Sequence, residues 1–299
     1  MELPGPAVQG TASQGGFYAL LDTGMVVGWD AASARPNTVV GLRDIVQIAA
    51  NNTVVVALRR DGVVYEWASR GERPFTSPGE PSPPTVVSGL ANIAQVATSA
   101  RHGIALDRDG HVYTWGFNGA GQLGTGSSEL TQPPTRVPGL DGITAIDAGL
   151  SSSFALTADG VLLAWGSNQS CMMGTGSRPG SEREPGGTQP TPTPIPGLKG
   201  VRAFDAGEGH VLAVLADGSV RAWGSNGYGQ IGNNAAGYQM VPGRVPGLPK
   251  VVAVRTSGFR SFAVTAGGDI WHWGVRMPGD TASGGQRTPA VLLRAETPE

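Results

Sequence analysis

The chain has 299 residues, of which 47 are Gly and 23 are Pro, and its formal net charge is −2. This composition indicates many short strands joined by tight turns, because apolar residues also recur in ordered clusters throughout the chain. The near-zero charge argues against a nucleic-acid-binding protein, and a single cysteine, Cys171, excludes an internal disulfide and a multi-cysteine zinc site.

The first predicted elements in chain order are two strands, Phe17–Leu21 and Met25–Trp29, which flank a turn at Gly24. This pattern, a glycine five residues before a tryptophan, occurs six times along the chain. In four copies an aspartate precedes the glycine, and Asp-Gly between apolar residues predicts a tight hairpin turn with a positive φ at both positions. The tryptophans that anchor the six repeats are Trp29, Trp67, Trp115, Trp165, Trp223 and Trp273.

A Gly-Leu pair is the second mark of the repeat. Its glycine lies 21 residues before the next hairpin glycine in all five cases. Constant spacing indicates packed strands whose register cannot slip, whereas the variable interval from each tryptophan to the next Gly-Leu indicates surface loops. In the fourth repeat we place the strands at Thr135–Leu140, Ile143–Ala148, Ser153–Thr157 and Val161–Trp165.

Six such units predict an all-β protein, a β-propeller with six four-stranded blades in one domain that spans residues 1–299. A propeller closes on itself, which removes exposed strand edges. We expect the segment Thr288–Ala295, which has the pattern of a fourth strand, to complete a blade that the N-terminal strands begin.

The segment that follows several tryptophans resembles the signature of the regulator-of-chromosome-condensation repeat family. It reads Trp-Gly-Phe-Asn-Gly-Ala-Gly-Gln-Leu-Gly from Trp115 and Trp-Gly-Ser-Asn-Gly-Tyr-Gly-Gln-Ile-Gly from Trp223. An altered copy contains Cys171, Met172 and Met173, which we interpret as gap-filling rather than as a soft-metal site. The resemblance implies a propeller, usually of seven blades, so seven is the alternative to six. Members include an exchange factor for a small GTPase, a plant ultraviolet-B photoreceptor and a bacterial β-lactamase inhibitor, so the resemblance does not imply one function.

The turn between the first two strands of each repeat is the candidate binding surface. Its residues differ chemically from repeat to repeat, whereas packing alone would keep them alike. By resemblance, the photoreceptor and the inhibitor also contact partners with this turn. For the two histidines alone, hydrogen bonding to neighbouring turns is the preferred interpretation. The candidate binding residues are Asn52, Arg101, His102, Ser151, Glu208, His210, Phe259 and Arg260.

We therefore predict a non-enzymatic platform that binds a protein or peptide. One alternative is guanine-nucleotide exchange on a small GTPase, which the resemblance implies and which would depend on the loop Ser167–Pro194, above all on Pro179–Gly187. The other alternative is a peptide-acting hydrolase on the same turns, with the catalytic residues His102, Ser151, Ser152, Glu208 and His210.

No ligand other than a protein or peptide is expected. The four histidines form no recognisable metal-binding pattern, and we expect no cofactor. No apolar stretch is long enough to span a membrane, and the N-terminal residues lack the layout of a signal peptide. We expect a cytoplasmic monomer that binds neither nucleic acid nor membranes.

Overall fold

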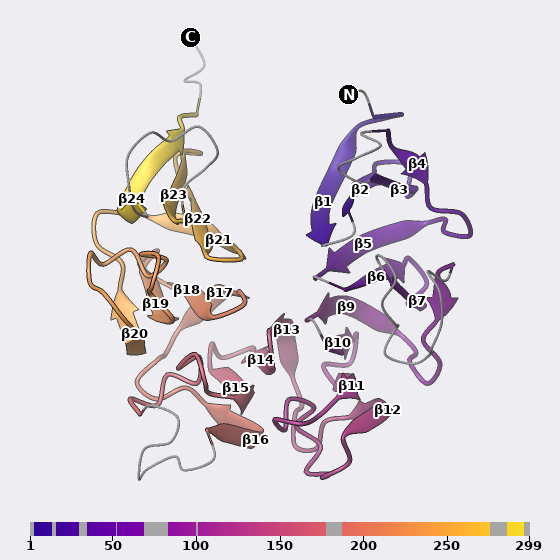
Figure 1. Ribbon diagram of the computed structural model, residues 1–299, viewed down its shortest axis with the longest axis horizontal. Coiled ribbons are helices and arrows are strands. Elements are labelled where there is room, and N and C mark those ends of the chain that lie inside the picture. Colours follow the sequence, from indigo (N-terminus) through magenta and orange to yellow (C-terminus); the bar gives the residue numbers. More distant parts are fainter. Residues whose placement is uncertain are drawn as a thin grey trace. The chain divides into compact units, whose positions relative to one another are not determined.

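The computed structural model describes residues 3–13, 16–29, 35–51, 53–68, 83–99, 101–177, 187–275 and 286–295 (Figure 1). The regular elements in these ranges are 24 β-strands, which form six sheets of four strands each. The predicted all-β fold with six four-stranded propeller blades is confirmed. In the described part of the chain, no helix is long and apolar enough to cross a membrane.

The chain divides into two compact units, and the first unit comprises Met1–Ser153. It contains the first three sheets and β13 (Ile143–Gly149), and within each sheet neighbouring strands follow chain order. The strands of these three sheets are β1 (Ala7–Ser13), β2 (Gly16–Leu21), β3 (Val26–Trp29), β4 (Asn37–Thr38), β5 (Ile45–Ala50), β6 (Val54–Arg59), β7 (Val64–Ala68), β8 (Thr85–Val86), β9 (Ile93–Thr98), β10 (His102–Asp107), β11 (Val112–Phe117) and β12 (Thr131–Arg136).

The second unit comprises Phe154–Glu299, so the boundary falls inside β14 (Ser152–Thr157) of the fourth sheet. The fourth sheet has the order β13-β14-β15-β16, and the fifth and sixth sheets repeat this pattern. The remaining strands are β15 (Leu162–Ser167), β16 (Thr188–Pro194), β17 (Val201–Ala206), β18 (His210–Leu215), β19 (Val220–Gly224), β20 (Gln239–Arg244), β21 (Val251–Ser257), β22 (Arg260–Thr265), β23 (Ile270–Gly274) and β24 (Gln286–Leu293).

The repeated tryptophan packs its ring on the preceding sheet. Trp115 of the third sheet is completely buried in a cluster that includes Val54 and Val56 of the second sheet. In the second unit Trp273 of the sixth sheet packs in the same way with Leu212 and Val220 of the fifth. Burial of so large an apolar surface stabilises the contact between neighbouring blades, which explains the fixed place of the tryptophan in the repeat.

Glutamine side chains join the first strands of neighbouring sheets in the first unit. The Gln47 amide in β5 donates to the carbonyl oxygen of Val96 in β9 at 2.8 Å, and the Gln47 oxygen accepts the Val96 N–H at 3.0 Å. Each such glutamine therefore satisfies one backbone donor and one backbone acceptor of the next sheet. The same pair of bonds joins Gln9 to Ile48 and Gln95 to Ile146.

An aspartate performs this linking role in the second unit. The carboxylate of Asp205 in β17 accepts the N–H of Thr256 in β21 at 2.7 Å and its hydroxyl proton at 2.6 Å. Burial raises the pKa of Asp205, and this effect outweighs the opposing influence of the Thr256 hydrogen bonds and of Arg255. The first strands are thus joined by side chains of different chemistry in the two units.

The hairpin turns between second and third strands differ from the predicted two-residue geometry. In the third sheet the N–H of Asp107 donates to the carbonyl oxygen of His111 at 3.0 Å, so three residues form the loop. Of these only Gly110 has a positive φ, of 85°, whereas Asp109 does not. A type I turn followed by a left-handed glycine closes such a loop. The prediction of a positive φ at both Asp and Gly is therefore wrong.

The C-terminal strand pairs within its own sheet. β24 lies beside β23, with Trp271 opposite Val291 and Gly274 opposite Gln286. The prediction that Thr288–Ala295 completes the N-terminal blade is wrong, because that sheet has four strands of its own, with β1 (Ala7–Ser13) at one edge and β4 (Asn37–Thr38) at the other. The strand predicted at Thr135–Leu140 in the fourth repeat is β12, which spans Thr131–Arg136 and pairs with β11 in the third sheet, so its assignment to the fourth repeat is wrong.

Candidate functional site

The candidate binding residues lie in the turns between first and second strands and in the segment that follows each Trp-Gly pair. We call these turns and segments, taken in each unit by itself, the turn face of that unit. Backbone hydrogen bonds hold its two parts together in each of three repeats: the N–H of Phe117 donates to the Arg101 carbonyl at 2.8 Å, and that of Ser225 to Gly209 at 2.7 Å. The third bond, at 3.0 Å, joins Val275 to Phe259.

Beneath the turn face in the first unit lies a buried chain of hydrogen bonds through His102. Its Nδ1 lies 2.6 Å from Oγ of Ser99, and its Nε2 lies 2.7 Å from Oγ of Ser153. The Ser153 hydroxyl donates to the carbonyl oxygen of Gln122 at 2.8 Å, so it accepts its other bond from Nε2–H. The neutral ring is thus protonated at Nε2 and accepts the Ser99 hydroxyl proton at Nδ1.

The second unit contains the same arrangement around His210. Nε2 of His210 lies 2.8 Å from Oγ of Ser261, whose hydroxyl donates to the carbonyl of Gln230 at 2.7 Å. The indole N–H of Trp273 donates to this same carbonyl at 2.8 Å. Gly207 occupies the place that Ser99 has in the first unit, and Nδ1 of His210 has no hydrogen-bond partner within the described part of the protein.

Both histidines support the turn face from inside. Their side chains are completely buried, and burial lowers the pKa of each from the usual 6.5 to about 3. They are therefore neutral at pH 7 and do not contribute to the exposed surface. Both nitrogens of His102 are engaged by Ser99 and Ser153, and neither is hydrogen-bonded to Ser151 or Ser152, the serines of the hydrolase alternative.

The exposed part of the turn face in the first unit carries a cation and apolar groups. The Arg101 guanidinium lies 5.1 Å from the ring centroid of Phe117, within the range of a cation–π interaction. Leu150 is exposed in the next turn, Ser151 is half-buried and Ser152 is buried. The candidate Asn52 lies outside the described residues.

In the second unit the turn face presents two aromatic rings. Tyr228 and Phe259 are 51% and 38% exposed, and their ring centroids lie 4.9 Å apart. Next to them, Nε of Arg260 donates to the Val275 carbonyl oxygen at 3.2 Å. Glu208 is half-buried in the turn that precedes β18. Exposed residues of three chemical types thus share this surface.

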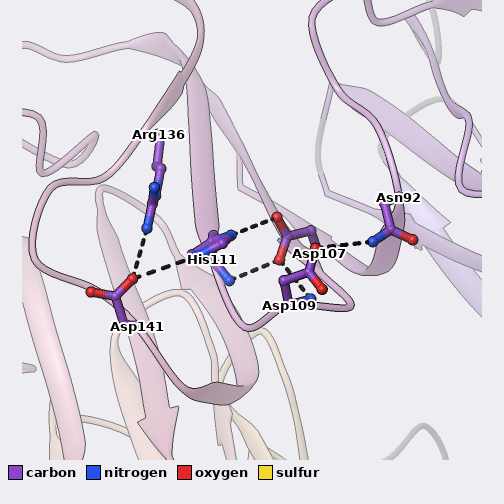
Figure 2. Close-up of polar contacts among 6 residues, drawn as sticks. All are labelled: Asn92, Asp107, Asp109, His111, Arg136 and Asp141. Atoms are coloured by element: carbon purple, nitrogen blue, oxygen red, sulfur yellow. Dashed lines mark hydrogen bonds and ion pairs between the residues drawn. The ribbon is translucent and has the colours of Figure 1, made fainter.

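A second polar cluster lies at the hairpin between β10 and β11, and Figure 2 shows its side chains. Asp107, Asp109 and His111 each place one potential metal-ligand atom within 4.8 Å of the others, a grouping that the sequence analysis did not predict. The Asp107 carboxylate accepts the backbone N–H groups of Asp109 at 2.9 Å and of His111 at 2.8 Å, and Nδ1 of His111 at 3.0 Å. These bonds identify Asp107 as the cap of the turn.

The charged side chains around this hairpin are hydrogen-bonded or ion-paired within the protein. Burial acts to raise the pKa of Asp107, but the hydrogen bonds from His111 and Asp109 lower it overall. On the other side of the imidazole, Nε2 of His111 lies 3.7 Å from the Asp141 carboxylate, which also accepts Arg136 at 2.7 Å (Figure 2). The cluster therefore fastens a hairpin loop, and its geometry indicates a structural role.

A family model described as the RCC1-like domain matches residues 7–296. The chain belongs to the RCC1-like domain family. Comparison with proteins whose functions are curated gives no significant match.

Two solved structures resemble this RCC1-like domain over nearly its whole length. Prp20p from Saccharomyces cerevisiae, described with its binding properties to Gsp1p and histones, has a TM-score of 0.80 at 23% identity, covering 96% of this chain and 76% of that chain. Human WBSCR16 has a TM-score of 0.79 at 20% identity, covering 98% and 83% respectively. At these identities the likeness concerns the fold alone.

The serine partners of the RCC1-like domain's histidines were not predicted from the sequence. Ser153 and Ser261 each lie 51 residues after the histidine that they contact, one position beyond the place of the histidine in the next repeat. This equal spacing is visible in the sequence and was the available signal. Tyr228, whose exposed ring contacts Phe259, was not predicted as a site residue either.

Two further predictions concern the loops. Cys171, Met172 and Met173 are buried, and the Met172 carbonyl accepts the indole N–H of Trp223 at 2.7 Å, which agrees with a packing role. In the loop proposed for nucleotide exchange, residues 178–186 lie outside the described residues.

Proposed function

We propose that this RCC1-like domain is a non-enzymatic platform that binds a protein or peptide through its turn face. One observation carries the proposal. The buried histidine–serine–carbonyl chain is the same in both units, whereas the exposed turn residues above it differ in every repeat. A constant frame under a variable exposed surface is the arrangement expected when the surface is selected for contact with a partner.

The buried histidines favour binding over catalysis. A general base must be within reach of its substrate, but His102 and His210 are completely buried. Structural relatives support a binding function: one yeast structure concerns binding to Gsp1p and histones, and another is Kap60 bound to yeast RCC1. Net charge and the shortage of basic residues support a protein rather than a nucleic acid as the partner.

Affinity capture from the source organism, followed by titration of the purified captured protein, tests the proposal. A turn-face variant would combine Arg101→Ala, Leu150→Ser and Phe259→Ser. The matched control would combine Lys199→Ala and Lys250→Ala, because both lysines are exposed and lie away from the turns: Lys250 lies beside the hairpin glycine Gly218, and Lys199 precedes Gly200, which lies beside the hairpin glycine Gly160.

We expect the turn-face variant to lose at least about tenfold in affinity, since hot-spot residues dominate binding, and the lysine control to bind as the native chain does. Binding that depends on the lysines and not on the turn face would contradict the proposal. Turnover of a peptide substrate by the native chain would contradict it as well.

A further inference from the structure

Both lysines of the chain lie at one hairpin, the loop that joins β18 and β19 of the fifth sheet. Lys199 precedes Gly200, whose carbonyl oxygen accepts the N–H of Ala216 in this loop at 2.9 Å. Lys250 contacts the same loop, because a Cβ built at Gly218 would lie 3.1 Å from Cβ of Lys250. Both lysines are exposed, so the loop is flanked by two solvated cations.

Two arginines lie on the strands that follow this loop. Arg221 in β19 and Arg244 in β20 are directly opposite each other in the antiparallel pair. Arg244 is exposed and Arg221 is half-buried. Because like charges in this arrangement destabilise a sheet, the stability of the sheet does not explain the pair.

The charges of the four cations are poorly compensated within the described part of the protein. Hydrogen bonds from Ser219 lower the pKa of Asp217 in the loop, and the charge of Arg221 lowers it further. The side chains of the other three cations have neither an ion pair nor a hydrogen bond among the described residues. We call the four cations the basic patch: Lys199, Arg221, Arg244 and Lys250.

The third repeat shows how the chain itself neutralises the place of Arg244. Residues 136–140 and 244–248 have the same sequence, Arg-Val-Pro-Gly-Leu. In the third repeat Asp141 follows, and its carboxylate accepts Arg136 at 2.7 Å. In the fifth repeat Pro249 follows instead. A carboxylate thus fits beside the arginine of this segment, and in the fifth repeat the chain does not supply one at this position.

We propose that the basic patch docks an acidic peptide segment of another protein, with one of its carboxylates beside Arg244 in the place that Asp141 has beside Arg136. Guanidinium groups bind carboxylates through short, charge-assisted hydrogen bonds, and the two lysines attract the flanking acidic residues. The strand β18 begins at the turn face with His210 and ends at this hairpin with Leu215. The inference therefore concerns a second surface and goes beyond the proposed function.

The third repeat also favours a carboxylate over a phosphate group as the anion. Asp217 and the net charge of −2 oppose every anion alike, so they do not decide between the two. Salt screens distant charges beyond about 8 Å at physiological ionic strength, so the local cations dominate at the patch. The pair of Asp141 and Arg136 is the observation that decides, because this backbone segment there holds an arginine at bonding distance from a carboxylate.

Fluorescence anisotropy with short labelled probes tests the basic patch. The probes are the acidic peptide Gly-Asp-Glu-Glu-Asp-Gly, the neutral peptide Gly-Asn-Gln-Gln-Asn-Gly and an oligothymidylate. The patch variants are Arg244→Glu and Lys250→Glu. The control is Arg43→Glu, because Arg43 is exposed before β5 in the first unit. Circular dichroism of each variant establishes that it is folded.

A second pair of variants supplies or withholds the missing carboxylate. Pro249→Asp places an aspartate where the third repeat has Asp141, whereas Pro249→Asn has nearly the same shape without the charge. An aspartate beside Arg244 competes with the carboxylate of the peptide. We therefore expect Pro249→Asp to bind the acidic peptide about fivefold more weakly than Pro249→Asn does.

We expect the acidic peptide to bind the native chain and the neutral peptide not to bind. Arg244→Glu and Lys250→Glu should each weaken binding by about tenfold or more, because a like charge then faces the peptide, whereas Arg43→Glu should leave it unchanged. Tighter patch-dependent binding of the oligothymidylate, an equal loss in Arg43→Glu, or equal affinities of the two Pro249 variants would overturn the inference.

The same peptide separates this inference from the proposed function. The turn-face variant should bind the acidic peptide as the native chain does, and loss of the peptide in that variant would overturn the inference. Failure of the acidic peptide with the native chain would overturn the inference too. A captured partner that still depends on the turn face would then leave the proposed function standing.

Discussion

Nε2 of His102 lies 2.7 Å from Oγ of Ser153 in the next sheet, and both side chains are completely buried. The contact spans 51 residues of sequence and recurs at 2.8 Å between His210 and Ser261. A neutral histidine in one blade thus depends on a hydroxyl supplied by its neighbour. The contribution of this hydrogen bond to the stability of the protein can therefore be measured by replacing the serine.

Replacing Ser153 by alanine removes the bridge between two buried groups. Nε2–H of His102 and the carbonyl of Gln122 both lose a partner, and unsatisfied buried polar groups are costly. We expect Ser153→Ala to lower the free energy of unfolding by about 2–4 kcal/mol, measured by urea denaturation. Ser151→Ala, in the half-buried turn beside it, is expected to change stability by less than about 0.5 kcal/mol. Equal effects of the two variants would show that the bridge is not the cause.

Ser99 has a smaller expected effect than Ser153. Ser99→Ala removes the hydroxyl that lies 2.6 Å from Nδ1 of His102, which leaves one acceptor unsatisfied. The second unit tolerates this state, because Gly207 stands at the same place and Nδ1 of His210 lacks a partner among the described residues. We expect a loss of about 1–2 kcal/mol in the same denaturation measurement. A loss larger than that of Ser153→Ala would refute this ranking.

The buried histidines predict a loss of stability in mild acid. Their folded-state pKa is about 3, below the usual 6.5, so only the unfolded chain takes up their protons between these pH values. Above pH 6.5 the pair contributes no pH dependence. From pH 7 to pH 5 we expect the pair to reduce the free energy of unfolding by about 4 kcal/mol. Nuclear magnetic resonance with imidazole signals assigned to His102 and His210 provides the check: titration of either one near pH 6.5 in the folded protein would contradict the prediction.

The hydrogen bonds of Gln95 predict that a Gln95→Glu variant has a stability that depends on pH. Gln95→Glu retains an oxygen for the N–H of Ile146 but places a carboxylate against the Ile146 carbonyl, which now accepts from the glutamine amide. We expect a loss of about 1–3 kcal/mol at pH 7. The difference from the native chain should shrink at lower pH, because protonation of the carboxyl restores a donor.

Two variants complete this test of the links. Gln95→Ala should lose stability at every pH, since it has neither donor nor acceptor. Val46→Thr, an exposed substitution on β5 beside Gln47, is the control and should remain near the native value. A Gln95→Glu variant whose deficit does not change with pH would refute the hydrogen-bonding explanation.

The sequence predicted the six four-stranded blades because turn glycines and tryptophans have fixed spacing, and fixed spacing reflects packed strands. It did not predict β1, whose residues Ala7–Ser13 are small or polar and mostly exposed, so no apolar alternation marks the strand. The missing first strand led to the wrong pairing of Thr288–Ala295. The Asp-Gly pattern also could not predict the sign of φ at Asp109, because this pair occurs both in two-residue and in three-residue hairpin loops.

For the candidate site, the turns were predictable and the roles of their side chains were not. The sequence does not show whether a histidine in a turn is buried or exposed, because its burial depends on the neighbouring blade. The exposed contact between Tyr228 and Phe259 joins residues of two repeats whose loops vary in length. Such a contact becomes visible only when the backbone is known.

The histidine–serine contact also limits how this protein can be lengthened or shortened. At the start of the second strand, the buried histidine occurs in the third and fifth repeats (His102 and His210). Its serine partner occurs in the fourth and sixth repeats (Ser153 and Ser261). Inserting one extra copy of the third repeat after itself would place the first of the two histidines against Gly103, which has no hydroxyl. Modules made of a histidine repeat and its serine neighbour avoid this mismatch, so gene duplication and protein engineering alike should succeed more readily with pairs than with single blades.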